Sequence, residues 1–304
     1  HNELIPMTPL TIVPPTDITH LLSMIPPREY IKRALQTPPM GKAAGPDGLS
    51  GELIKLLPID KIETELHELY TNFAQEDIPT CYLTSSVWFI NKKKGDRTDP
   101  SSYRPISLIN YDMVILTNWL LTLITPHIQT WLPDTQQGFV KGRWTINNIR
   151  YVQDLLVALK DPRFCKALGL RDTGLFLAFL DFRKAFDTGN WTFLMQSLQQ
   201  LRPIPQELIF WIPRLYHQNF TILLGCDNDE ENSLPPLKVS QGVKQGDPLS
   251  PILFNLMANT LIVHFKALNI PTTVSYREQQ PDERQELPSI IQYADDTFLC
   301  VRSE

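Results

Sequence analysis

Residues 290–301 read IIQYADDTFLCV, in which two runs of strand-forming residues flank Ala294-Asp295-Asp296. Apolar, β-branched and aromatic residues on both sides of a short polar step predict a tight β-hairpin with the two acids in its bend. Adjacent carboxylates repel each other, so both stay ionised at neutral pH only where cations neutralise them. Asp-Asp is also a common solvated turn, but the apolar flanks predict a buried hairpin that presents the acids at its end.

A further acid follows an apolar run earlier in the chain. Residues 175–180 read LFLAFL and lead directly into Asp181, which predicts a buried strand that ends at a carboxylate. A charge after six apolar residues is costly to bury unless it is paired or binds a metal; the alternative is an exposed strand end. We expect Asp181 to lie close to Asp295 and Asp296.

Three converging carboxylates predict a divalent-cation site. Mg²⁺ is usually held by one or two carboxylates together with substrate phosphates. Two such ions, about 4 Å apart, can stabilise both the attacking and the leaving oxygen of a phosphoryl displacement. We therefore expect two Mg²⁺ ions, with Mn²⁺ as the alternative ion, and a reaction at a phosphate.

The rest of the chain interleaves strands with helices, which predicts a layered α/β or α+β domain. Residues 87–90 and 103–109 predict a hairpin with a basic tip, and GPDG at residues 45–48 is a strong turn signal. Residues 221–224 and 237–240 predict paired strands. The spacing of apolar residues predicts helices over 52–57, 62–73, 113–130, 147–159, 191–200, 206–217 and 251–267.

Composition is that of an ordinary globular protein, with 304 residues, 42% hydrophobic residues and a net charge of −5. The acidic balance argues mildly against a nucleic-acid binder, although a local basic patch matters more than the total charge. No CxxC pair occurs, so we expect neither a zinc site nor a disulfide framework from Cys81, Cys165, Cys226 and Cys300. From the opening residues we expect no signal peptide, and the longest apolar run, residues 113–125, is too short to span a bilayer.

Seven motifs then follow one another along the chain. They are KAAGPDG at 42–48, FINKKKG at 89–95, SYRPISL at 102–108, QQGFVKGR at 136–143, LDFRKAFD at 180–187, QGVKQGDPLSP at 241–251 and YADD at 293–296. With these motifs the chain resembles the reverse transcriptase domain of LINE-type non-LTR retrotransposons, with group II intron enzymes as more distant relatives. YADD alone occurs by chance, whereas seven motifs in the family's order argue against coincidence. Two positions differ from the family's usual pattern: Asp247 stands where many members have Cys, and Gly189 stands where a β-branched residue is common.

The resemblance implies an α+β, right-hand polymerase fold of fingers and palm, with an antiparallel palm sheet packed on helices. Residues 1–73 would form an N-terminal extension with a helical finger motif, and residues 74–304 the reverse transcriptase domain. Within that domain we expect fingers over 74–174 and an incomplete palm over 175–304. We expect the thumb to be missing.

The resemblance also implies roles for single residues. Asp181, Asp295 and Asp296 would be the catalytic metal ligands, with the backbone carbonyl of Phe182 as a further oxygen. The remaining acid of the 180–187 motif, Asp187, would be structural and would cap the helix expected at 191–200.

Five residues would bind the nucleotide. Lys92 and Arg104 would grip the triphosphate, since Lys supplies a point charge and Arg a planar fork. Phe186 would pack under the sugar and leave no room for a 2′-hydroxyl. Gln245 and Gly246 would pack against nucleotide and template, where a missing side chain permits close approach.

Template or primer phosphates would be contacted by Lys141 and Arg143, and also by Asn148. The lysines at 93 and 94 belong to the same basic tip as Lys92, where at least one of the three is expected to be a solvated turn residue.

The implied function is that of an RNA-directed DNA polymerase, which joins a primer 3′-hydroxyl to a deoxynucleoside triphosphate. Its partners would be an RNA template, a DNA primer and dNTP; no membrane or protein partner is inferred, and the expected location is intracellular and nuclear. Three alternatives stay open. They are a non-catalytic RNA-binding scaffold, which the intact acids disfavour, an inactive retrotransposon fragment, and a group II intron maturase, which the finger motifs disfavour.

Overall fold

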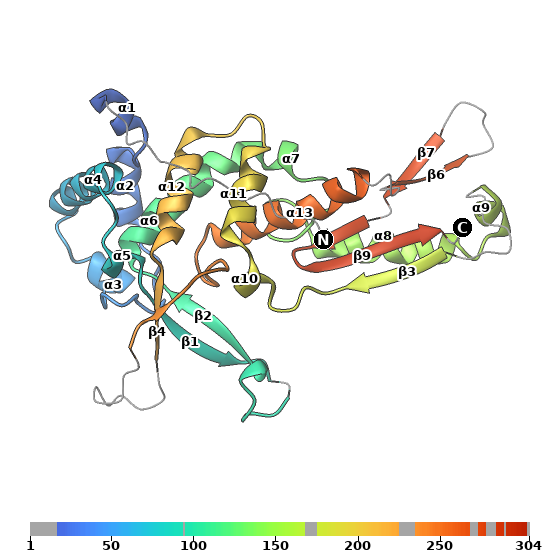
Figure 1. The fold of residues 1–304 in the computed structure, drawn as a ribbon, viewed down its shortest axis with the longest axis horizontal. Coiled ribbons are helices and arrows are strands. Elements are labelled where there is room, and N and C mark those ends of the chain that lie inside the picture. The colour runs from blue at the N-terminus through green and yellow to red at the C-terminus, as the bar shows by residue number, and fades with distance from the viewer. Residues whose placement is uncertain are drawn as a thin grey trace. The chain divides into compact units, whose positions relative to one another are not determined.

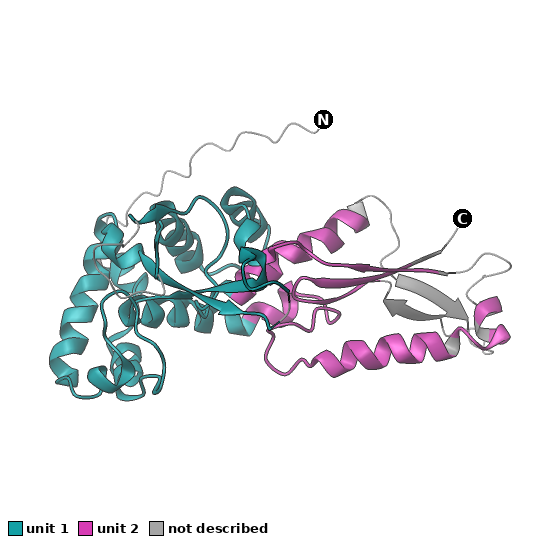
Figure 2. Cartoon of the chain, turned by 90° about the horizontal axis from the view of Figure 1, so that it is seen from below, with its two compact units in different colours: residues 1–126, 186–250 teal, residues 127–185, 251–304 magenta. Residues whose placement is uncertain are grey.

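The computed structural model describes residues 17–93, 95–167, 175–224, 235–267, 273–277, 284–288 and 290–302. The chain divides into two compact units (Figure 2): unit 1 comprises residues 1–126 and 186–250, and unit 2 comprises residues 127–185 and 251–304. Both units combine helices with β-sheet, as expected for the α+β class. The predicted boundaries between extension, fingers and palm are a functional division that these units do not test.

Unit 1 is mainly helical. In α2 and α4 apolar residues recur every three or four positions, and the two helices pack against each other with Ile31, Leu35, Tyr70 and Phe73 buried. α6 is apolar on most of its faces and is buried accordingly. The helices are α1 (Ile18–Ser23), α2 (Arg28–Gln36), α3 (Gly51–Ile54), α4 (Ile59–Gln75), α5 (Thr80–Leu83), α6 (Tyr111–Ile124), α11 (Trp191–Gln199) and α12 (Gln206–His217).

The sheet of unit 1 has the strand order β2-β1-β4-β5. β1 (Ser85–Asn91) and β2 (Tyr103–Leu108) form the predicted antiparallel hairpin, and a short 3-10 helix, η1 (Pro100–Ser102), precedes β2 (Figure 1). β4 (Phe220–Leu223) pairs in parallel with β1 and in antiparallel with β5 (Leu237–Lys238). The predicted β4–β5 pair is therefore confirmed, whereas the parallel pair with β1 was not predicted.

Unit 2 contains a three-stranded antiparallel sheet of order β3-β9-β8 (Figure 1). Leu155 of α8 packs on this sheet together with Ile291, Phe298 and Cys300. The short 3-10 helix η2 (Thr125–His127) begins two residues before the first residue of the unit. The other elements of the unit are α7 (Ile128–Trp131), α8 (Thr145–Ala158), α9 (Pro162–Ala167), β3 (Leu175–Leu180), α13 (Ser250–Ala267), β6 (Thr273–Arg277), β7 (Arg284–Pro288), β8 (Ile290–Tyr293) and β9 (Asp296–Arg302). The short helix α10 (Ala185–Thr188) lies where the chain passes from unit 2 to unit 1.

The hairpin at residues 290–301 forms as predicted, with Ile290, Ile291 and Phe298 buried. The prediction of a buried strand at residues 175–180 is wrong, because Phe176, Phe179 and Leu180 are 63%, 74% and 42% exposed. β3 is the edge strand of its sheet. An edge strand has a neighbouring strand on one side only. A run of apolar residues does not show whether the strand will lie at the edge or in the middle of its sheet.

Within the described residues, no helix is both long and apolar enough to cross a membrane.

Candidate active site

The acids of unit 2 lie at one end of its sheet. Tyr293 pairs with Asp296, so Ala294 and Asp295 form the two-residue bend of the β8–β9 hairpin. On the other side of β9, the last pair with β3 is Leu180 with Thr297. Asp181 is the next residue after that pair and falls opposite Asp296, where neighbouring antiparallel Cα atoms are about 5 Å apart. The register therefore brings together the three acids that the sequence singled out.

The electrostatics of Asp295 reflect this crowding. Burial raises the pKa of its carboxyl group, and the nearby Asp296 and Asp181 carboxylates raise that pKa further, against a lowering backbone hydrogen bond. Asp181 and Asp296 are exposed, whereas Asp295 is partly buried. A cation bound at this end of the sheet would relieve the repulsion among the three groups.

The three carboxylates suit a hard ion such as Mg²⁺, which is shared with a substrate, better than an ion enclosed by protein side chains alone. In the part of the chain that the structure describes, no three His, Cys, Asp or Glu side chains form a ready-made cluster around a metal. Mg²⁺ commonly keeps several waters and shares its coordination between one or two carboxylates and a substrate's phosphates. Acids brought together by strand register, with room left for water and phosphate oxygens, are consistent with that mode of binding.

A cavity of about 430 Å³ opens beside the acids within unit 2. Its walls come from α8 and from the sheet, and they are largely apolar, with Ile149, Val152 and Phe179 among them. Asp181 and Asp296 form part of the same wall. The acids are thus reached from a groove rather than enclosed in the core.

Phe182, whose carbonyl was predicted as a further ligand, follows Asp181 directly. Its ring makes an edge-to-face contact with Phe254 of α13, at 6.4 Å between ring centroids. This contact fixes the segment that leaves β3, although the direction of the Phe182 carbonyl stays a prediction.

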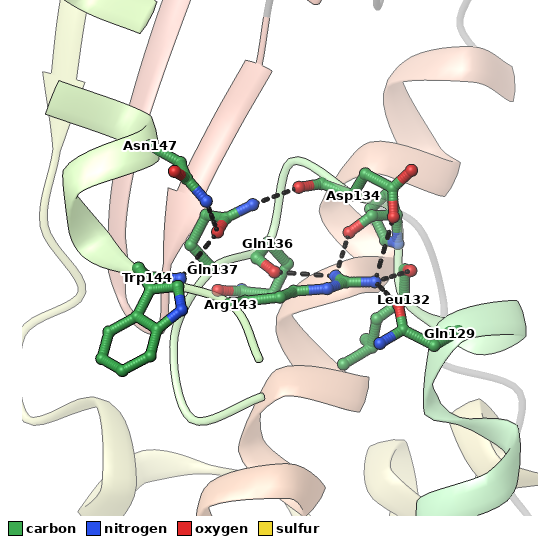
Figure 3. Close-up of polar contacts among 9 residues, drawn as sticks. Gln129, Leu132, Asp134, Gln136, Gln137, Arg143, Trp144 and Asn147 are labelled. Atoms are coloured by element: carbon green, nitrogen blue, oxygen red, sulfur yellow. Dashed lines mark hydrogen bonds and ion pairs between the residues drawn. The ribbon is translucent and has the colours of Figure 1, made fainter. Parts of the chain in front are cut away.

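The residues predicted to bind nucleic acid behave differently from one another. Lys141 is exposed, while Asn148 donates a 2.9 Å hydrogen bond to the carbonyl of Gln292. The side chain of Arg143 is only 7% exposed, and its guanidinium pairs with Asp134. It also donates to Gln129 and to three backbone carbonyls (Figure 3), those of Leu132, Pro133 and Gln136. Arg143 therefore holds its own loop together, and this geometry gives no support to its predicted phosphate contact.

In unit 1, the two cations predicted to grip a triphosphate lie on the β1–β2 hairpin. Arg104 pairs with Ile90, and the ladder continues to Lys92, whose N–H donates to Ser102. Residues two apart along a strand lie on the same face, so Lys92 and Arg104 share one face of the hairpin. Both side chains are exposed, and the Lys92 ammonium reaches the carbonyl of Ser101. Lys94 lies outside the described residues.

The motif at 241–251 packs against other parts of unit 1. Gly246 has a φ of +128°, and a Cβ built there would lie 2.3 Å from the carbonyl oxygen of Ser107 in β2. The N–H of Ser107 donates to the carbonyl of Gln245, whose side chain donates to Asp187. The missing side chain of Gly246 thus permits close approach to β2, and its predicted contact with a nucleotide stays a prediction.

Phe186 and Asp187 lie in α10. Phe186 is partly buried, and its carbonyl accepts the N–H of Val243 at 2.7 Å. The prediction that Asp187 caps the helix at 191–200 is wrong, because Asn190 occupies the N-cap of α11 and accepts the N–H of Phe193. An N-cap directly precedes the first helical residue, and Asp187 lies too far upstream.

Comparison with known proteins shows the family of the chain. Residues 90–304 match the family model described as reverse transcriptase (RNA-dependent DNA polymerase). This match covers more than half of the chain, so the chain belongs to the reverse transcriptase family, and the predicted family and fold class are confirmed.

The relatives come from transposable elements. The RNA-directed DNA polymerase from mobile element jockey of Drosophila melanogaster is 27% identical over 280 residues, which make up 91% of this chain and 27% of that protein. The 149 kDa protein of transposon TX1 of Xenopus laevis is 28% identical, covering 90% of this chain and 19% of its own length. The Pol polyprotein of element R2 of Nasonia vitripennis is 28% identical over 221 residues, which make up 72% of this chain and 19% of that protein. The chain spans less than a third of each.

Among solved structures, an apo telomerase from Candida tropicalis aligns with 79% of this chain and 49% of its own, at 12% identity and a TM-score of 0.46.

Proposed function

We propose that the chain carries the polymerase site of a non-LTR retrotransposon reverse transcriptase. The reaction is RNA-templated attack of a primer 3′-hydroxyl on a deoxynucleoside triphosphate, with release of pyrophosphate. One observation carries the proposal: strand register brings Asp181, from one strand end, beside the Asp295-Asp296 bend. A binding scaffold has no use for such concentrated negative charge.

Each carboxylate would act as an oxygen ligand. Two Mg²⁺ ions, or Mn²⁺ in their place, would be held by Asp181, Asp295, Asp296 and the Phe182 carbonyl, and would neutralise charge on the attacking and leaving oxygens. The protein's own contribution is to position these oxygens, with Asp181 and Asp296 in the wall of the groove.

Nucleotide binding would fall to residues of unit 1. Lys92 and Arg104, on one face of their hairpin, would contact the triphosphate. Phe186 would exclude a 2′-hydroxyl at the sugar, and Gln245 with Gly246 would border the nucleotide and template. This assignment uses the family's pattern residue by residue.

Template and primer would be bound through phosphates. Lys141 is exposed and free to serve in this role, and Asn148 would have to share its amide between Gln292 and a ligand. Fingers over 74–174, a palm over 175–304 and a nuclear location belong to the same proposal.

The test is incorporation of a labelled dNTP on an RNA template with a DNA primer. Asp295→Asn and Asp296→Asn should each lower incorporation by at least about 10²-fold, because removing one charge-stabilising group of a preorganised site costs on that order. Asp77→Asn, an exposed acid of unit 1 outside the motifs, is the control and should retain activity. RNA binding without incorporation by the parent chain would instead support the scaffold alternative.

A further inference from the structure

The residue before the first acid of the bend has an unusual backbone. Ala294 has a φ of +55°, in the left-handed region that residues with a Cβ seldom adopt. It is also buried. A left-handed alanine persists only when its surroundings hold it in place. The direction of the Asp295 and Asp296 side chains depends on that backbone, so whatever holds Ala294 also aims the acids.

A single side-chain amide makes the contacts with Ala294. The oxygen of Gln136 accepts the N–H of Ala294 at 2.9 Å and the N–H of Gly138 at 3.0 Å. Its nitrogen faces the carbonyl of Ala294 at 3.4 Å and the side-chain oxygen of Gln292 at 3.5 Å. Gln136 is 0% exposed. One buried amide therefore binds both polar groups of the residue that sets the bend.

The backbone around Gln136 docks on the same strand. The N–H of Gln137 donates to the carbonyl of Gln292, and the N–H of Gln292 donates to the carbonyl of Thr135. A Cβ at Gly138 would lie 2.3 Å from the nitrogen of Ala294. Glycine is thus required where the loop touches the bend, and the loop cannot move away without breaking these bonds.

Two further residues secure the loop on its other sides. Arg143 ties the carbonyls of Leu132, Pro133 and Gln136 together (Figure 3). Asn255 of α13 is fully buried and donates a 2.6 Å hydrogen bond to the carbonyl of Gly138. Gln136 is therefore presented by a braced loop rather than by a mobile one.

We infer that Gln136 is a positioning residue for the acids of the polymerase site, which it holds in their metal-binding direction through Ala294. The inference rests on the proposed function for its catalytic meaning. The hydrogen bonds between the Gln136 side chain and the backbone of Ala294, which we call the clamp, can be tested without the reaction. Ligands must be held within about half an ångström of their productive positions, and Gln136 is the side chain that constrains this turn.

The matched pair of variants is Gln136→Met and Gln137→Met. Gln137 is also buried in the loop, but its side-chain amide bonds to Asp134, Trp144 and Asn147 and not to the hairpin. Both substitutions remove one buried amide of the same shape. Only the first releases Ala294.

The primary measurement is amide hydrogen exchange at Ala294, followed by NMR on the full chain. Gln136→Met should speed exchange at Ala294 by at least about tenfold, because the amide loses its buried acceptor. The same variant should weaken Mn²⁺ binding by about tenfold and raise the Mg²⁺ concentration needed for half-maximal incorporation. Gln137→Met should leave all three near the parent's values.

The outcomes separate the two proposals. Equal changes in both variants, or no change at Ala294 in Gln136→Met, would overturn the clamp and leave Gln136 as ordinary loop packing. A parent chain that does not polymerise, combined with faster exchange at Ala294 in Gln136→Met, would remove the proposed function and keep the clamp. Gln136→Asn, one methylene too short to reach Ala294, serves the same comparison if Gln136→Met does not fold.

Discussion

The carboxyl group of Asp112, at the start of α6, is partly buried in unit 1. Burial raises the pKa of Asp112 to about 6, the charge of Asp47 adds to the rise, and the hydrogen bond from the N–H of Met113 opposes it. The folded state thus favours the protonated form. Asp112 costs no stability below its unfolded pKa near 4; the cost grows as the pH rises from about 4 to 6, where only the unfolded state is ionised, and stays at its full value above 6.

Asp112→Asn should therefore stabilise the protein in a pH-dependent way. Asn keeps an oxygen for the Met113 N–H but carries no charge. The free energy of unfolding should rise by about 3 kcal/mol at pH 7 and change little at pH 4, since the pKa is raised by about two units and one unit corresponds to about 1.4 kcal/mol. Urea unfolding at the two pH values measures this, with exposed Asp77→Asn as the control. An equal effect at both pH values would contradict the argument.

Phe186 is the second residue whose role can be tested alone. It follows Asp181 by five residues and is partly buried in α10. If its ring excludes the 2′-hydroxyl, Phe186→Val should raise the ratio of ribonucleotide to deoxynucleotide incorporation by about tenfold or more, as expected when a pocket gains about four carbon atoms of space. Phe193→Val on α11 is the control. An unchanged ratio with surviving activity would place the gate elsewhere.

The convergence of Asp181 with Asp295 and Asp296 could be predicted because the pattern is visible in the sequence: two adjacent acids between apolar runs, and one acid after another run. The role of Gln136 could not. Its partner Ala294 lies far away in sequence, and an uncharged amide in a polar motif gives no sign that it will be buried. Asn190 was missed as a cap for a simpler reason, since Asp187 is an equally good capping residue type and only the observed helix start decides between them.

The strand β3 shows that an apolar sequence can predict a strand without predicting whether its side chains are buried. Six apolar residues predict a strand, and the strand is there. Whether a strand is central or at an edge depends on partners elsewhere in the chain, which the run itself does not encode. The β1–β2 hairpin and α8 were predictable because their signals are local: turn residues, alternation and helical spacing.

The loop at residues 132–143 is held as an element by Arg143, and Arg143→Lys tests this. Lysine has no planar fork and cannot reach a carboxylate, an amide and three carbonyls together. The free energy of unfolding should fall by about 2 kcal/mol, as for the loss of buried charge-assisted hydrogen bonds. Arg163→Lys is the control, since Arg163 pairs with Asp161 at the surface and should cost under about 0.5 kcal/mol. Equal losses in urea unfolding would count against the bracing role.

Over the whole chain the net charge is −5, but acidic and basic side chains are unevenly distributed. Acids collect at the end of the unit 2 sheet, whereas exposed cations occupy the β1–β2 hairpin and the loop at Lys141. A nucleic acid responds to the local charge, because each phosphate contact releases counterions. The division into two units with interleaved segments was not predictable, since it depends on contacts between residues distant in sequence.

Salt dependence tests this charge distribution. The triple variant Lys92→Glu, Arg104→Glu, Lys141→Glu should bind template–primer more weakly than the parent. Its affinity should also fall less steeply with salt, by roughly 0.7–0.9 in the logarithmic slope for each lost phosphate contact. Lys55→Glu reverses an exposed lysine outside the proposed patch and serves as the control. A triple variant that binds as tightly as the parent would contradict the assignment.

Asp181, Asp295 and Asp296 are proposed to hold the same metal ions. A crystal structure of the chain with Mn²⁺ and a deoxynucleoside triphosphate, in which anomalous scattering locates the ions, tests this assignment. We expect Mn²⁺ between the Asp181 carboxylate and the bend, with carboxylate oxygens at about 2–2.5 Å from the ions. Mn²⁺ bound elsewhere, or an Asp181 carboxylate more than about 10 Å from the bend and so unable to share an ion with it, would show that the three acids do not form one metal site.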